Sequence, residues 1–456
     1  MAHILEQLFG AFATLGLVLL AGYAPARLLL PSDLQRWFWL AVPLLGYATS
    51  AISLGWISIF LPLSLGVWLF LGATIVVSAL VLLRDGLPSG RQAWLEQAVV
   101  GTLAAIALSI GLLPLWDRPE LLAIGPNWDI EIYLPLAEYL KQFSTGFSLT
   151  DPAGLPFPGG SNPLLWRINF FDPRWAGLAF SQLHSAVGVI LHQEAHQHFA
   201  GVLALLGALS LPAAFLFFRA AFGLDRTSGL LATTLLAFNP ATLYVVFWSF
   251  GQQVASLPLA PLALLAGLLA LRRPGVPVAL LAGLSLAALL ATFIPAGLLY
   301  GLPFAALVLH AGLSVHQRRE VFSTTLGIVG TSLVLAPWAY LRGALRAYHF
   351  LEEGGAIGLT VGPDVTRFPP LTWALGLAAT PESPVAGPLS SLFSLLLPVL
   401  VVAALIVAFR RKNAPLLACS LAFLALLGIL RFMMPYPYGY LKLLPSGSFI
   451  MIGLLV

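Results

Sequence analysis

Two carboxylates lie close together in the passage "GPNWDIEIYLPLAEYLKQF", residues 125–143. Asp129 and Glu131 are two residues apart and follow a long, largely apolar stretch. A carboxylate that lipid and aromatic side chains shield from water holds a proton more readily, as a general base must. With Trp128 and Tyr133 close by in the sequence, Asp129 is a candidate base.

The geometry of this pair depends on the local structure. In a helix, residues i and i+2 point to different sides. In an extended stretch they share a face and can bind a divalent metal together. Pro135 favours the first position of a helix, which places Asp129 and Glu131 in the turn before it. The simpler interpretation is that both acids only solvate a loop.

The composition indicates a polytopic membrane protein. Hydrophobic residues make up 59% of the chain, charged residues 9%, and the mean hydropathy is +0.94. About a quarter of the residues of soluble proteins are charged. Apolar runs of about 17 to 25 residues predict an all-α fold with about thirteen membrane-spanning helices. The runs lie near residues 8–30, 37–61, 64–83, 97–115, 198–218, 228–247, 254–271, 277–294, 296–311, 322–341, 389–409, 414–430 and 443–456.

The runs divide the chain into four parts. Residues 1–96 hold the first three helices, and 97–342 hold a transmembrane core with a long outer loop at 116–197. Residues 343–388 form a second outer loop, and 389–456 hold the last helices. Ala24-Pro25-Ala26 has the pattern of a signal-peptide cleavage site, but the leader has Glu6 and no Lys or Arg, which favours a retained span. The final run is either a short last helix or the point at which a longer chain is truncated, with a C-terminal domain beyond it.

Basic residues predict the orientation of the chain. Lys and Arg concentrate in cytoplasmic loops. Thirteen of the 22 fall in short turns that share one side if the N-terminus is extracytoplasmic. These turns carry Arg27, Arg36, Arg84, Arg91, Arg219, Arg226, Arg272, Arg273, Arg318, Arg319, Arg410, Arg411 and Lys412. Thirteen of the 18 acids fall on the outer side. Acids contribute little to orientation, so this bias indicates chemistry on the outer face of a cytoplasmic membrane.

The two long outer segments are expected to be functional, because long connections in compact proteins usually are. The first is rich in Trp, Phe and Pro, which suits a loop packed on the membrane surface. Within it, residues 176–192 have an apolar side and a polar side that carries Gln182 and His184. This pattern predicts a helix that lies in the membrane interface.

Other motifs give weaker signals. His192 and His196 in "HQEAH" have the i, i+4 spacing of helical zinc ligands. A zincin needs Glu directly after the first His, where Gln193 stands, so a structural cluster is favoured over a metalloprotease. Cys419 is the one cysteine, so an intrachain disulfide is excluded. The pI near 9.3 reflects the inner turns, and no nucleic-acid partner is expected.

Two passages carry a resemblance to a known superfamily. "NWDIEIYLPLAEYL" looks like the acidic outer-loop passage of large bacterial integral-membrane glycosyltransferases of the C type (GT-C). These are related to the enzymes that use dolichyl- and polyprenyl-phosphate sugars. "RFMMPYPYGYLKLL" looks like a late outer-loop passage of the same proteins. The resemblance covers roughly residues 97–442. The chain departs from well-studied members in having three helices before the span that precedes the acids.

The resemblance implies an inverting transfer of a sugar from a polyprenyl-phosphate donor to a glycan, lipid or protein acceptor. Asp129 matches the catalytic acid, which deprotonates the acceptor hydroxyl. Glu131 matches the second acid, in a supporting role or as a ligand of Mg²⁺ or Mn²⁺. Arg431 and Lys442 are candidates to stabilise the leaving phosphate, because fixed positive charge stabilises charge that develops there. Anchoring to lipid headgroups explains these two cations equally well.

Four further residues are candidate substrate contacts: Tyr133, Tyr438, His349 and Gln252. Tyr438 either stacks on a sugar or belongs to the aromatic belt of the membrane interface. His349 lies in the second outer loop, which suits an acceptor-binding lid. Gln252 lies at an outer turn, in "WSFGQQ".

Two other functions stay open. Proline-interrupted spans such as 254–271 keep a flippase or polymerase of lipid-linked sugars, or another transporter, as an alternative. The predicted spans hold no charged residue in their middle, which favours an enzyme over an ion-coupled transporter. A non-catalytic protein with a GT-C-like fold is the third hypothesis.

Overall fold

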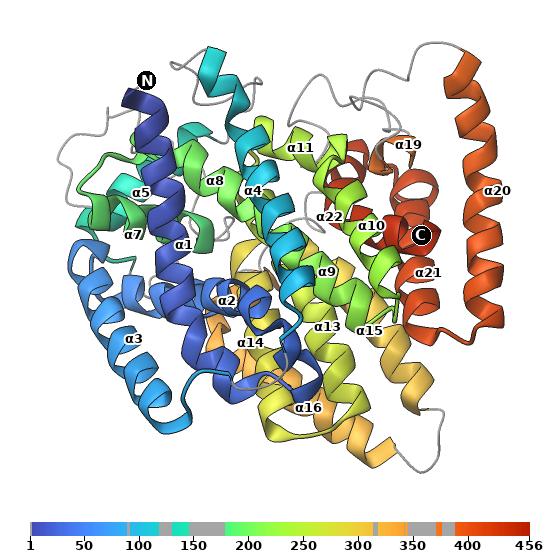
Figure 1. The fold of residues 1–456 in the computed structure, drawn as a ribbon, viewed down its shortest axis with the longest axis horizontal. Helices are drawn as coiled ribbons and strands as arrows, with labels where there is room; N and C mark the ends of the chain where they lie inside the picture. The colour runs from blue at the N-terminus through green and yellow to red at the C-terminus, as the bar shows by residue number, and fades with distance from the viewer. Residues whose placement is uncertain are drawn as a thin grey trace.

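A computed structural model describes residues 2–88, 92–117, 130–145, 178–312, 318–341, 343–344, 371–375 and 388–456. Within these residues every regular element is helical, which confirms the all-α prediction (Figure 1). In this described part, eight helical segments are long and apolar enough to cross a membrane. They are His3–Leu29, Ser32–Phe60, Leu63–Asp85, Trp94–Trp116, Phe199–Ala220, Arg226–Phe247, Gly251–Arg272 and Ala414–Met433.

The other five predicted runs are helical as well. They contain α14 (Val276–Thr292), α15 (Ala296–Gly312), α16 (Arg318–Leu335), α20 (Pro388–Arg410) and α22 (Pro437–Leu455). The described apolar parts of these helices are shorter than a full span or carry more charge. These five spans therefore stay predictions, and so does a total of about thirteen.

Proline and asparagine break three consecutive spans into pairs of helices. The pairs are α8 (Phe199–Ala208) with α9 (Ser210–Ala220), α10 (Arg226–Ala237) with α11 (Pro240–Phe247), and α12 (Gly251–Ser256) with α13 (Leu259–Arg272). Asn239 caps α11 by accepting from the N–H groups of Ala241 and Thr242, and Pro240 follows at the first helical position. Its amide Nδ2 donates to the carbonyl of Ala374, 2.8 Å away. Ala374 belongs to the short helix α19 (Leu371–Ala374), in the predicted second outer loop.

The N-terminal part of the chain forms four helices and one 3₁₀ turn. They are α1 (Ala2–Leu29), the 3₁₀ turn η1 (Ser32–Trp37), α2 (Phe38–Phe60), α3 (Leu63–Asp85) and α4 (Trp94–Asp117). Helices α1 and α2 cross at Gly22 and Gly46, and a Cβ on either residue would lie under 2 Å from a carbonyl oxygen of the other helix. Small residues at a crossing let helix backbones approach closely. Helix α20 stands at one edge of the molecule, beside α21 (Ala414–Gly428) (Figure 1).

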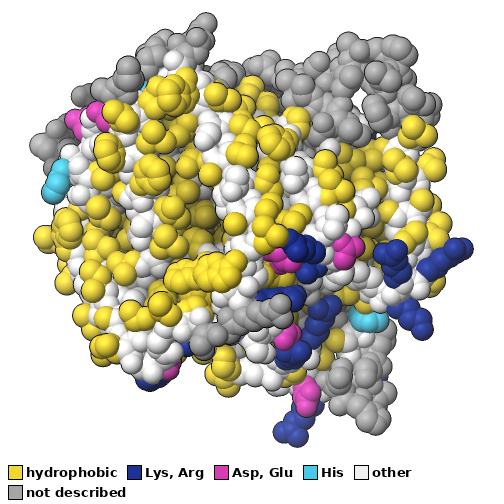
Figure 2. All heavy atoms as spheres, viewed as in Figure 1, with side chains coloured by type: hydrophobic (Ala, Val, Ile, Leu, Met, Phe, Trp, Pro, Cys, Tyr) yellow, Lys and Arg dark blue, Asp and Glu magenta, His cyan; other side chains and the backbone are white. Residues whose placement is uncertain are grey.

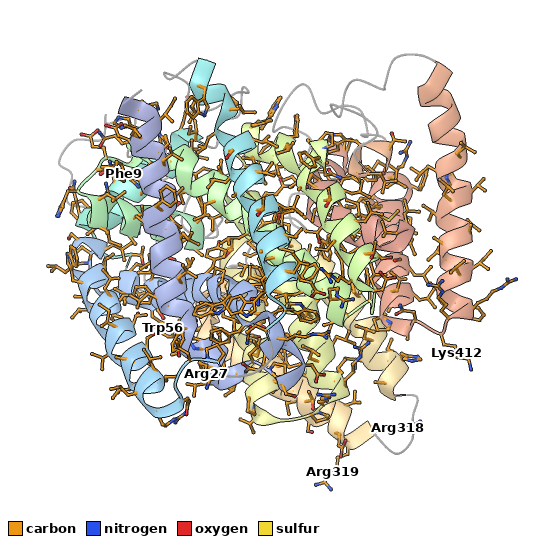
Figure 3. All side chains as sticks on the ribbon, in the orientation of Figure 1. Phe9, Arg27, Trp56, Arg318, Arg319 and Lys412 are labelled. Carbon is orange, nitrogen blue, oxygen red and sulfur yellow. The ribbon has the colours of Figure 1, made fainter. Side chains whose placement is uncertain are left out.

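The predicted inner turns gather at one end of the molecule. Arg27, Arg318, Arg319 and Lys412 all lie at the end opposite the N-terminus (Figure 3), and Lys and Arg side chains cluster on that part of the surface (Figure 2). At this end, side chains from two other elements meet the buried carboxylate of Glu96. Its carboxylate accepts from the indole N–H of Trp37 at 2.5 Å and lies 3.7 Å from the guanidinium of Arg219. These turns therefore lie at one end of the molecule, as the sequence predicts.

The predicted interfacial helix forms, but its position differs. Helix α7 (Ala179–Leu191) is buried from Ala179 to Gly188 on its polar side as well as its apolar side. Gln182 donates to the hydroxyl of Ser58 on α2, 2.8 Å away. The polar side of α7 therefore faces neighbouring helices rather than headgroups, and the prediction of a surface position is wrong.

Candidate functional site

The structure describes only some of the predicted site residues. Asp129 and His349 lie outside the described residues, and so does the side chain of Tyr438, whose backbone is in α22. Glu131, Tyr133, Gln252, Arg431 and Lys442 are described. Tyr133 and Lys442, more than 300 residues apart in sequence, both contact residues 250–253 at the start of α12.

Helix α5 (Ile130–Gln142) carries Glu131 in its first turn. Pro135 lies inside this helix, so the prediction of Pro135 at the first helical position is wrong. A proline within the helix has no N–H to donate to the carbonyl of Glu131 four residues earlier. Burial of side chains on both sides of Pro135 keeps the helix continuous through the proline. The buried residues are Ile132, Tyr133, Leu136, Ala137 and Leu140.

Tyr133 connects α5 to the turn before α12. Its side chain is only 4% exposed and packs edge-on against Phe180 of α7, with ring centroids 5.2 Å apart. The backbone N–H of Gln252 donates to the Tyr133 hydroxyl, with N and O 3.4 Å apart. A Cβ on Gly251 would lie 2.8 Å from the Tyr133 ring and 2.7 Å from the Phe180 ring, so only glycine fits there.

The turn itself has an unusual backbone. Ser249 is buried and has φ 55°, in the left-handed region that non-glycine residues rarely adopt. Gly251 N–H then donates to the carbonyl of Ser249 at 2.8 Å. Such strain persists only where the surrounding structure fixes it, and it concentrates at functional sites. The turn brings Phe250 and Gln253 against α22.

Lys442 meets this turn from α22. Its ammonium nitrogen lies 5.0 Å from the ring centre of Phe250 and 5.9 Å from that of Phe293, within the range of cation–π attraction. The Nε2 of Gln253 donates to the carbonyl of Lys442 at 2.6 Å. Sequence reasoning did not connect Phe250, Phe293 and Gln253 to Lys442, because their proximity depends on how α12, α14 and α22 pack.

Arg431 lies on a different element, the π-helical turn η4 (Ile429–Met433). It hydrogen-bonds to the hydroxyl of Tyr440 in α22. The neighbouring Phe432 and Met433 are 77% and 76% exposed. Turns of this π type recur at functional sites.

A partly buried polar cluster joins α5 to α7 and to residues 195–198. Glu138 Oε1 accepts from the ammonium of Lys141 at 2.7 Å and from the N–H of Ala195 at 2.5 Å. Nε2 of His184 lies 2.9 Å from the Ala195 carbonyl, and Nε2 of His198 lies 3.0 Å from the His184 carbonyl. Since a carbonyl only accepts, both rings carry their proton on Nε2. Burial lowers the pKa of His198 to about 4 and holds the pKa of His184 well below its usual value.

No single helix carries both histidines of "HQEAH". Helix α7 ends at Leu191, and His192 adopts a left-handed conformation as its C-cap. His196 then lies in the 3₁₀ turn η3 (Ala195–Gln197). Among the described residues, no group of three His, Cys, Asp or Glu side chains converges to hold a metal ion. The described residues around Glu131 therefore do not supply a set of ligands for Mg²⁺ or Mn²⁺.

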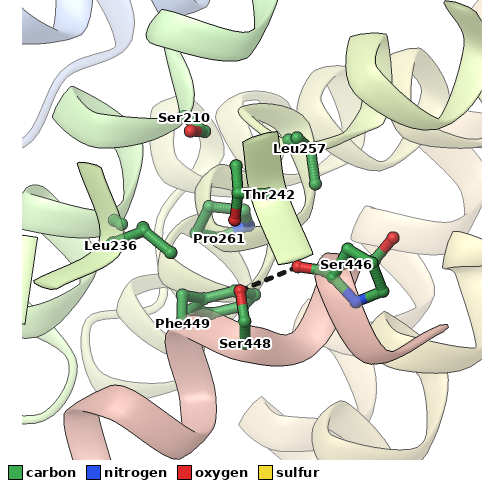
Figure 4. A pocket seen from close by; sticks show the side chains of 10 residues that line it. Ser210, Leu236, Thr242, Leu257, Pro261, Ser446, Ser448 and Phe449 are labelled. Atoms are coloured by element: carbon green, nitrogen blue, oxygen red, sulfur yellow. Dashed lines mark hydrogen bonds between the residues drawn. The ribbon is translucent and has the colours of Figure 1, made fainter. Parts of the chain in front are cut away.

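A cavity lies one turn deeper along α22 than Lys442 (Figure 4). It is small, with a volume of about 10 Å³ for the centres of water-sized spheres, and four hydroxyls line it among apolar side chains. The hydroxyl residues are Ser210, Thr242, Ser446 and Ser448. Ser446 Oγ donates to the Lys442 carbonyl at 3.1 Å, so this carbonyl joins the cavity wall to the turn before α12. A volume of this size holds about one water molecule, so this cavity does not accommodate a sugar.

Comparisons of this chain with protein-family models, curated proteins and solved structures find no match.

Proposed function

We propose that this protein is a GT-C-like membrane glycosyltransferase. It transfers a sugar from a polyprenyl-phosphate donor to a glycan, lipid or protein acceptor on the extracytoplasmic face of the cytoplasmic membrane. One observation supports this proposal most strongly. The acidic passage, through Tyr133, and the late basic passage, through Lys442, contact the same turn of residues 250–253. These are the two passages that carry the resemblance.

The proposed chemistry assigns a separate task to each passage. Asp129 takes the proton of the acceptor hydroxyl, and the resulting oxygen attacks the anomeric carbon of the donor sugar. The bond from that carbon to the phosphate oxygen breaks, and the lipid phosphate leaves with its electron pair. Lys442 stabilises the negative charge on this phosphate. Glu131, two residues after Asp129 and in the first turn of α5, assists. Attack from the side opposite the phosphate inverts the anomeric centre.

The elements around this turn fit an enzyme that keeps its scaffold rigid. Tyr133, Gly251 and Phe180 pack without space between them, and Gln253 bonds to the second turn of α22. Sites built on packed helices hold reacting groups more accurately than sites on loops. The donor's phosphate would reach Lys442 at the outer end of α22.

Transport of a lipid-linked sugar is the second hypothesis. It is favoured by the three consecutive broken spans and by buried Asn239 at one of the breaks, since transporters bind substrates at discontinuous helices. No Asp, Glu, Lys or Arg lies in the middle of the eight described membrane-crossing segments, which favours the enzyme. A non-catalytic protein of this fold is the third hypothesis.

Native mass spectrometry of the protein, purified gently from its own membranes, tests the proposal. We expect a bound polyprenyl-phosphate sugar, enriched in the Asp129→Asn variant because transfer is blocked while the donor still binds. Finding only bulk phospholipid in both proteins would favour the non-catalytic hypothesis or a transporter of another substrate, and equal occupancy by a lipid-linked sugar in both would favour its transport. Unchanged transfer by Asp129→Asn would remove Asp129 from the mechanism.

A further inference from the structure

Gln253 is a buried amide with one satisfied end and one unsatisfied end. Its side chain is 1% exposed. Nε2 donates to the Lys442 carbonyl at 2.6 Å, which fixes the orientation of the amide because a carbonyl only accepts. The other end, Oε1, is buried and has no hydrogen-bond donor within reach among the described residues. A buried carbonyl oxygen without a donor is costly, so this oxygen needs a partner from outside these residues.

The chemistry of this oxygen restricts its partner. An amide oxygen accepts hydrogen bonds and donates none, so it binds a hydroxyl or an N–H group and repels an unprotonated phosphate. Lys442 has the opposite character, because its ammonium only donates. The Gln253 amide is bonded to the Lys442 backbone, and the Lys442 ammonium lies 5.0 Å from the ring centre of Phe250, three residues before Gln253. A ligand that satisfies both carries an anionic phosphate next to a hydroxyl.

We propose that Gln253 is the residue that recognises the sugar of the donor. Its Oε1 accepts a hydrogen bond from a sugar hydroxyl, while Lys442 binds the adjoining phosphate. This proposal rests on the proposed function and adds to it that separate residues of the donor site bind the sugar and the phosphate. Gln253 distinguishes a glycosylated lipid phosphate from a bare one, and Lys442 does not. A buried polar group that loses its partner discriminates strongly against ligands that lack the matching group.

The experiment compares the binding of four probes by native mass spectrometry. The probes are undecaprenyl phosphate and its glucose, mannose and galactose conjugates. For the wild-type protein we expect at least one conjugate to bind about tenfold more tightly than undecaprenyl phosphate, as one buried hydrogen bond allows. Gln253→Met should bring this ratio to about one. Because the variant also loses the bond to the Lys442 carbonyl, its affinity for undecaprenyl phosphate can fall as well, and the ratio alone is the test. The ratio is measured within one sample, so a partial loss of folded protein does not change it.

Two further variants make the result specific. Gln97→Met removes another buried amide, at the inner end, where Gln97 binds the backbone of Arg36 and Trp39; it should keep the wild-type ratio. Gln253→Asn withdraws the amide by one carbon and should also lose the ratio, which covers the case that Gln253→Met does not fold. A wild-type ratio that persists in the Gln253 variants would overturn the proposal, as would a wild-type ratio near one. Failure of the proposed function looks different: the wild-type protein would then bind none of the four lipids, or it would bind a conjugate with the same occupancy as Asp129→Asn because neither protein transfers the sugar.

Discussion

Several buried residues at the end opposite the Arg-rich turns bond to backbone groups of other elements. The Tyr133 hydroxyl accepts from the backbone of Gln252, the Gln253 amide donates to the backbone of Lys442, and His198 binds the backbone carbonyl of His184. Such bonds fix where a helix begins relative to its neighbours. A substitution at one of these residues therefore affects the position of another residue's side chain.

Lys442 is the cation that the proposed mechanism needs most. Lys442→Met should lower the rate of donor consumption by about 100-fold or more, because removal of one group that stabilises developing charge has an effect of this size. Lys442→Arg should retain part of the rate, since the charge stays but its geometry changes. Single-turnover consumption of bound donor measures the effect. Lys412→Met, an exposed lysine at the opposite end, is the control. A wild-type rate in Lys442→Met would exclude a role for this ammonium in phosphate departure.

The buried histidines predict how stability depends on pH. Burial depresses the pKa of His198 to about 4 and that of His184 well below 6.5, so between these values the unfolded chain binds more protons than the folded one. Stability is therefore full above about pH 6.5 and falls as the pH drops towards 4, by at most about 1.4 kcal/mol per pH unit for each histidine. Thermal inactivation in detergent at a series of pH values measures this slope.

A variant separates the histidines from other acid effects. His198→Gln keeps a side-chain N–H that can reach the His184 carbonyl and removes the titrating group. We expect the midpoint of thermal inactivation to change less between pH 6.5 and 4 in this variant than in the wild type. An identical slope would mean that the carboxylates, such as Glu138 in its pair with Lys141, dominate the acid sensitivity.

At the level of elements, the approach of α1 to α2 is the tightest helix crossing described above. Gly22→Ala would place a methyl group 1.8 Å from the carbonyl oxygen of Val42, so the helices must separate. We expect a loss of about 1–3 kcal/mol, the usual cost of overpacking, and a lower midpoint of thermal inactivation. Gly16→Ala on the same helix is the matched control, because a Cβ there meets nothing within 4 Å. Equal midpoints for the two variants would contradict the crossing.

Elements also account for the predictions that were wrong. The sequence around Pro135 predicts a helix start, and the polar side of residues 176–192 predicts exposure. Helix α5 instead continues through the proline, and α7 buries its polar side against α2, where Ser58 accepts from Gln182. A local pattern gives the helix and its two sides, but it does not show whether a polar side meets water or the polar group of another helix.

For the whole molecule, orientation is the property that an experiment can establish directly. Cys419 is buried, so a Cys419→Ala background carries no cysteine. Glu194 and Lys412 are both exposed and lie on the predicted outer and inner sides. In intact cells, a membrane-impermeant maleimide should label Glu194→Cys, and it should label Lys412→Cys only after permeabilisation. The reverse pattern would place the proposed site on the cytoplasmic side and contradict a donor presented at the outer face.

The sequence by itself determined the class of fold and the positions of its helices. Apolar runs must form helices in lipid, because every backbone polar group needs a partner there. For this reason all thirteen predicted runs contain helices. The Arg-rich turns gather at one end because basic residues concentrate in the loops on one side of a membrane protein. The acidic and basic passages were also visible in the sequence, as clusters of charge in an apolar chain.

Only the tertiary structure decided which of these passages meet. Tyr133 and Lys442 meet at residues 250–253 because α5 and α22 both contact the start of α12, and Arg431 lies on η4, bonded to Tyr440 of α22. The strained backbone at Ser249, the unsatisfied oxygen of Gln253 and the aromatic faces around Lys442 also depend on that packing. In a membrane protein nearly every helix is apolar, so apolarity does not specify which helices are neighbours. Close contacts of small residues and a few buried polar bonds specify it instead.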